Sequence, residues 1–143
     1  MRSIPVLWSL LGVAWIAALI GGDAGLVRAA DAIGAGHEHT VYSAQLPNAR
    51  GKTLTAIVVE YGPRGSSPAH RHAGSVFAYV LSGRIRSENS ATGPVRVYRA
   101  GEIFFEPPGS THLISANASE TEPASLLAVF VADDQAQLTQ PAH

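Results

Sequence analysis

Short apolar runs separated by turn residues follow one another along most of the chain. The runs are LTAIVVEY (54–61), VFAYVL (76–81), RIRSEN (84–89), VRVYRAGEIFFE (95–106, interrupted at 100–101), HLIS (112–115) and SLLAVFVA (125–132). They are rich in β-branched and aromatic residues and are bounded by Gly, Pro, Asn and Ser, which is typical of strands. No stretch after residue 40 keeps the 3.6-residue repeat of a helix.

Six to eight short strands in one chain of 143 residues predict a single all-β domain, either a sandwich or a closed barrel. Runs such as AIVV and LLAVFV are apolar on both faces. We therefore expect them to be covered by the barrel interior on one side and by a second sheet or subunit on the other. The domain is expected over 40–132, with a flexible lead-in at 30–39 and a polar C-terminal tail at 133–143.

The first 30 residues have a different character. A positive start at Arg2 precedes the uncharged run 4–20, and small residues lead to the sequence VRAADA at 27–32. This layout predicts a signal peptide over 1–29, cleaved after Ala29 or Ala32, and an exported protein, either periplasmic or secreted. The alternative is an uncleaved membrane anchor at 4–20, a length at the lower limit of the about 17–25 residues that cross a bilayer.

Charge and composition exclude several function classes. The formal net charge is −1 and the ten basic residues are scattered, so no basic stripe for a nucleic acid exists. The chain has no cysteine, which excludes disulfides, thiol nucleophiles and thiolate metal ligands. No Gly-x-Ser-x-Gly sequence and few aspartates are present, which disfavours a serine hydrolase.

Histidines suggest a metal site. His70 and His72 are two residues apart, so in a strand both rings point to one face. His112 follows the predicted turn at 107–111 and opens another strand, so it can lie inside the same barrel. Imidazole suits Fe, Zn, Cu and Ni, and the ligand type does not choose among these metals or exclude Mn.

These residues resemble the two motifs of the cupin family. In GSSPAHRHAGSVFAYVLSG (65–83), the His pair and Gly83 fall in place, while Gly65 stands one residue too close to His70. In GEIFFEPPGSTHLISAN (101–117), the matching residues are Gly101, Pro107, Gly109 and His112, and Asn117 is late by one. The resemblance covers about 40–132. It implies a double-stranded β-helix, or jelly-roll barrel, with a divalent metal held by His70, His72 and His112.

One departure from the family pattern concerns the acid ligand. The glutamate of the family's first motif falls at Val76 here, and residues 70, 72 and 76 share strand parity, so Val76 is expected to line the pocket. Three neutral imidazoles leave a divalent ion at +2, which suits a small anionic or bidentate oxygen ligand. The alternative is a cupin that has lost its metal and binds only an organic ligand.

Other acids and histidines lie near the motifs. Glu106, before the turn that leads to His112, is the first candidate for a general base or for a partner of the metal ligands. Glu60 or Glu106 could also replace the missing acid, and the alternative is that each is a rim residue in water. His37 and His39 form a second pair, interpreted as part of a solvated tail or else as a lid or extra ligand.

The resemblance implies metal-dependent oxidation or oxygenation of a small organic molecule. The rival hypothesis is a non-catalytic protein that binds a small anion or metal chelate, because fold does not fix function. We expect a homodimer, no nucleic-acid partner, and no membrane contact once the signal peptide is removed.

Overall fold

The computed structural model describes residues 36–142 of the chain. The predicted signal peptide at 1–29 and the alternative anchor at 4–20 lie outside this range. Every regular element in the described part is a β-strand. That part contains no helix of the length and hydropathy needed to cross a membrane.

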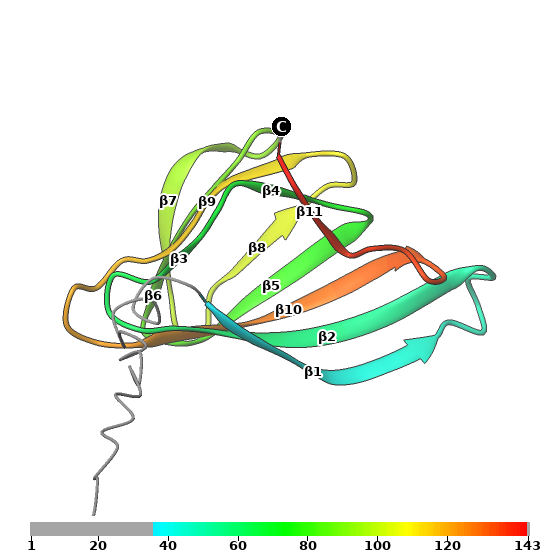
Figure 1. The fold of residues 1–143 in the computed structure, drawn as a ribbon, viewed down its shortest axis with the longest axis horizontal. Helices are drawn as coiled ribbons and strands as arrows, with labels where there is room; N and C mark the ends of the chain where they lie inside the picture. Colours follow the sequence, from blue (N-terminus) through cyan, green and yellow to red (C-terminus); the bar gives the residue numbers. More distant parts are fainter. Residues whose placement is uncertain (1–35, 143) are drawn as a thin grey trace, which may run out of the picture.

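Two antiparallel sheets face each other and enclose the core (Figure 1). The first sheet has the order β1 (His37–Gln45), β2 (Lys52–Tyr61), β10 (Ala124–Asp133), β5 (Ser75–Ser82) and β8 (Ile103–Glu106). The second has the order β11 (Thr139–Pro141), β4 (His70–His72), β9 (Thr111–Asn117), β6 (Arg84–Asn89) and β7 (Gly93–Arg99), and β3 (Ser66–Ser67) also pairs with β9. This is the predicted all-β jelly-roll barrel.

Alternation along the strands builds the core. In β5, Val76, Ala78 and Val80 point inward and are buried, while the residues between them are more exposed. Ile85 of β6 meets them from the other sheet, and neither Ile85 nor Val80 has any exposed surface. Burying such side chains contributes about 1.5–3 kcal/mol each, so this interior holds the two sheets together.

Two motif glycines are required by backbone geometry. Gly83, between β5 and β6, has φ 66°, and a Cβ there would lie 2.5 Å from the carbonyl oxygen of Pro123. Gly109, in the turn before β9, has φ 77°. Only glycine adopts these conformations without strain, so the turns that lead to the second sheet are fixed by the sequence.

The ends of the domain differ from the sequence-based prediction. The six predicted strand segments are all present, but β1 begins at His37, inside the predicted lead-in at 30–39. The predicted tail at 133–143 contains β11, which pairs with β4 through Thr139↔His72 and Pro141↔His70. Both segments are ordered because they complete the hydrogen bonding of a neighbouring strand, β2 for β1 and β4 for β11.

Candidate metal centre

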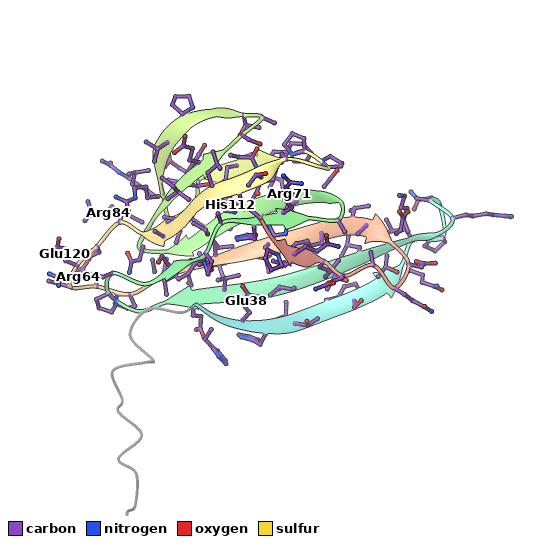
Figure 2. The ribbon with its side chains drawn as sticks, turned by 45° about the horizontal axis from the view of Figure 1, so that its top comes forward. Glu38, Arg64, Arg71, Arg84, His112 and Glu120 are labelled. Carbon is purple, nitrogen blue, oxygen red and sulfur yellow. The ribbon has the colours of Figure 1, made fainter. Side chains whose placement is uncertain are left out.

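The three predicted histidines meet inside the barrel. His70 and His72 lie on β4, and His112 lies on β9 directly opposite His70 in the strand register. The ring centroid of His70 lies 4.7 Å from the ring centroid of His72 and 5.1 Å from that of His112. One ring nitrogen from each histidine lies within 4.8 Å of the others. Figure 2 shows His112 between the two sheets, away from the end where Arg64, Arg84 and Glu120 gather.

One nitrogen of each ring is already engaged by a neighbouring oxygen. The contacts are His70 Nδ1 to the Pro68 carbonyl at 2.6 Å, His72 Nδ1 to the Leu138 carbonyl at 3.2 Å, and His112 Nε2 to Ser87 Oγ at 2.8 Å. Metal-binding histidines are commonly held in this way, because the outer hydrogen bond fixes the ring and its tautomer. The other nitrogens are Nε2 of His70, Nε2 of His72 and Nδ1 of His112, and the last two lie beside Glu106.

Glu106 lies beside these rings and not in solvent. Its side chain points inward from β8 and the residue is 2% exposed, so the alternative of a rim residue in water is wrong. Its Oε1 lies 3.0 Å from His112 Nδ1, and its Oε2 lies 3.8 Å from His72 Nε2. Glu60, the other acid considered, is exposed and does not reach the three histidines.

The surroundings favour an ionised Glu106. Burial alone raises the pKa of its carboxyl, but the hydrogen bond from His112, the nearby rings of His112 and His72 and the amide of Asn89 outweigh burial and hold the pKa below its ordinary value. Burial lowers the pKa of His72, and the charge of Glu106 offsets this in part. A neutral ring beside a carboxylate is the protonation state that binds a metal.

Asn89 holds the carboxylate in place. Its buried amide Nδ2 donates to Glu106 Oε2 at 3.1 Å and to Ser110 Oγ at 2.9 Å. The roles of Asn89, Ser87 and Leu138 were not predicted from the sequence. The alternation in RIRSEN places Ser87 and Asn89 on one face, which was an available signal, whereas nothing local marked Leu138.

Val76 lies in the wall of the cavity at the three histidines. It is 1% exposed and lines the cavity with the three histidines. In the register of β5 and β8 it lies directly opposite Glu106. Val76, which stands where the family pattern has a glutamate, is therefore the cross-strand neighbour of Glu106.

The cavity at the histidines is small and adjoins a larger pocket. The inner space has a volume of about 30 Å³, enough for one or two water molecules. The adjoining pocket has about 300 Å³ and shares four lining residues with it: Glu38, Ser67, His70 and Thr139. The volume of the outer pocket is in the range of small-molecule sites, and His70 lines both spaces.

The second histidine pair lies on the outside of the barrel. His37 and His39 are in the edge strand β1 with Glu60 opposite His37 on β2, and all three are exposed. One ligand atom from each lies within 4.8 Å of the others. The pair is therefore neither in a solvated tail nor a ligand of the inner site.

Comparison with solved structures finds the same fold in proteins of low sequence identity. An uncharacterised double-stranded β-helix protein from Klebsiella pneumoniae is 22% identical, with 77% of this chain and 86% of that chain covered and a TM-score of 0.58. The DMSP lyase DddQ from Ruegeria pomeroyi is 20% identical, with 75% and 51% covered and a TM-score of 0.59. A recombinant oxalate oxidase in complex with glycolate is 25% identical, with 62% and 45% covered and a TM-score of 0.53.

The last two similarities extend over about half of those enzymes or less. No curated protein matches the chain significantly. The family model described as "Cupin domain" matches residues 57–130, which is slightly more than half of the chain and contains both motifs and all three histidines. This chain belongs to the cupin family.

Proposed function

We propose that this protein holds a divalent metal on His70, His72 and His112 and uses it to oxidise or oxygenate a small organic molecule, with O₂ as the oxidant. The observation that carries the proposal is the arrangement of the three rings. Each has one nitrogen engaged by a backbone or serine oxygen, and one ligand atom of each lies within 4.8 Å of the others. The three residues line a cavity that adjoins a pocket. Three imidazoles are a donor set that suits a divalent transition metal.

The chain's own residues supply binding and orientation. A metal bound here would supply Lewis acidity and, if redox-active, electron transfer. The inner cavity excludes all but a few atoms of the ligand, and Val76, Phe104 and Phe130 give it apolar walls. Glu106 can serve the reaction as a proton acceptor or by holding the metal, and these two roles predict different effects on metal affinity.

The substrate is proposed to be a small molecule with an oxygen-bearing end. The inner volume limits what can contact the histidines, and the outer pocket limits the remainder of the molecule. The oxalate oxidase that the chain resembles was solved with glycolate, a small hydroxy acid. Glycolate and related two- to four-carbon acids are therefore the first compounds to test.

The proposal is tested by metal analysis and oxygen uptake. The purified protein, reconstituted anaerobically with Fe, Mn, Zn, Cu or Ni, is expected to bind about one equivalent, and one redox-active form is expected to consume O₂ with a small acid. His112→Ala should lose the metal yet keep its strand signal in circular dichroism. A wild type that binds no metal overturns the proposal, and tight metal with no turnover supports a binding protein instead.

Export is part of the proposal. The N-terminal layout of charge, apolar run and small residues supports it. Protein isolated from a cell that exports it is expected to begin at Ala30 or Ile33 by N-terminal sequencing. An intact Met1 in the membrane fraction would support the anchor at 4–20 instead.

We also propose a homodimer formed through the first sheet. The outer face of β5 and β8 exposes five large apolar side chains on two paired strands: Phe77, Tyr79, Leu81, Ile103 and Phe105. Such a continuous patch is typical of a protein interface. Light scattering is expected to give a dimer for the wild type and a monomer for Phe77→Glu, whereas a wild-type monomer contradicts this part of the proposal.

A further inference from the structure

The position of Glu106 distinguishes two roles for a carboxylate near a metal. A carboxylate that only orients a histidine accepts a hydrogen bond from the ring nitrogen that faces away from the ion. In this site those nitrogens are taken by Pro68, Leu138 and Ser87. Glu106 instead contacts the remaining nitrogens of His112 and His72, where the ion would lie.

The distances from Glu106 to two of the three histidines are close to those expected for a shared ion. Metal–nitrogen and metal–oxygen bonds of about 2.0–2.2 Å place two ligand atoms of one ion about 3–3.6 Å apart. The oxygens of Glu106 lie 3.0 Å from His112 Nδ1 and 3.8 Å from His72 Nε2. Small side-chain adjustments would bring all three groups into contact with one ion.

The strand register explains where this acid comes from. Val76 of β5 and Glu106 of β8 are direct partners, and both side chains point into the barrel. Directly opposed residues have Cβ atoms about 4.5–5.5 Å apart, so a carboxylate on either strand can reach the same point. The site can therefore obtain its acid from β8 while position 76 remains apolar.

We propose that Glu106 is the fourth ligand of the metal and replaces, from the neighbouring strand, the acid absent at Val76. The proposal rests on the metal binding of the proposed function. Asn89 is a positioning residue, because its amide fixes Oε2 through a hydrogen bond in a buried setting. The centre then has three imidazoles and one carboxylate, and a divalent ion in it carries +1 instead of the +2 expected for three imidazoles alone.

A coordinated carboxylate is not a free base. The inference therefore replaces the general-base role expected for Glu106 from the sequence. Coordination by Glu106 also weakens the preference of the metal for anionic ligands, because the protein already supplies one negative charge. Neutral or singly charged oxygen ligands fit such a centre better than dianions do.

The first test measures metal affinity by chelator competition in Glu106→Gln, with Glu102→Gln as an exposed control near the same strand. Glutamine keeps the shape and an acceptor oxygen for His112, so an orienting role would largely survive the change. If Glu106 is a ligand, the variant should bind the metal at least about 100-fold more weakly. Loss of a residue that only hydrogen-bonds to a ligand typically lowers metal affinity by about 10–100-fold. Wild-type affinity in Glu106→Gln, with an unchanged thermal melt, overturns the inference.

The second test exchanges the two cross-strand partners. In the double variant Val76→Glu with Glu106→Val the carboxylate returns to β5, and affinity should recover by at least about tenfold over Glu106→Val alone, because either strand reaches the same point. If the folded double variant binds the metal no better than Glu106→Val alone, a carboxylate at position 76 does not reach the ion. That result counts against Glu106 as a metal ligand.

A third measurement needs no variant. A crystal structure of the metal-loaded wild type should place a Glu106 oxygen about 2.0–2.2 Å from the ion. A metal held by the three histidines, with Glu106 beyond bonding distance, overturns this inference but leaves the proposed function intact. A wild type that binds no metal in any preparation overturns both.

Discussion

His70-Arg71-His72 in β4 and His37-Glu38-His39 in β1 have the same spacing, and in both the two rings share one face of a strand. The β4 pair meets a third histidine and a buried acid inside the barrel. The β1 pair is exposed on an edge strand, and its third group is the exposed Glu60. Spacing therefore brings two rings together in either setting.

The difference lies in what surrounds the rings. Oxygens of Pro68 and Leu138 hold the inner pair, whereas none of the side-chain hydrogen bonds within residues 36–142 holds a ring of His37 or His39. The inner rings lose little freedom when an ion binds, because they are already oriented. The outer rings lose side-chain entropy and remain hydrated. The inner site should thus be a resident metal site and the outer pair at most a weak one.

The largest expected effect comes from removing one ring of each pair. His72→Ala should lower metal affinity by at least about 100-fold, because it deletes a ligand, while His39→Ala should leave the resident metal in place. Metal content after dialysis against a chelator measures both variants. Equal loss in the two variants would show that the outer pair also holds the resident ion.

An intermediate effect is expected from the partner of His112. Ser87→Ala removes the oxygen that engages His112 Nε2, and metal affinity should fall by about tenfold, the lower end for loss of an outer partner. Ser82→Ala, which removes an exposed serine–serine hydrogen bond, is the control and should have no effect. Titration calorimetry with zinc measures both, and an unchanged affinity for Ser87→Ala would mean that ring orientation contributes little.

The smallest effect concerns the outer pair itself. After the inner site is filled, added zinc should bind to His37, His39 and Glu60 about 100-fold more weakly, because these groups lack orienting partners. This binding should vanish in His39→Ala, because the variant removes one of the three ligand groups. Histidine NMR shifts would follow it, and a second site as tight as the first would contradict the comparison.

Much of the barrel could be predicted from the sequence because its strands follow a local rule. Alternation and turn residues locate β5, β6 and β10 within one or two residues. β11 could not be predicted, since Thr-Gln-Pro has no strand pattern of its own and pairs because β4 offers it hydrogen-bonding groups. For the same reason the Leu138 carbonyl at His72 was not foreseen.

The histidines of the site were predictable and the acid was ambiguous. His70, His72 and His112 are marked by spacing and by the Pro-Gly turn, which act locally. Glu106 ends the run IFFE, in which consecutive apolar residues do not reveal which face is inward. Its burial follows from the pairing of β8 with β5, a contact between segments about 30 residues apart.

The step in volume between the inner cavity and the outer pocket has a consequence for selectivity. If a compound binds there, only its terminal atoms can meet His72 and His112, which line the inner cavity alone, so compounds that share one end group should contact these two rings alike. Discrimination among them must then depend on how the rest of each compound fits the rim formed by residues such as Glu38, Ser67 and Thr139. The rim is not independent of the centre, because Glu38, Ser67 and Thr139 line both spaces and Thr139 Oγ1 lies 3.3 Å from His72 Nδ1.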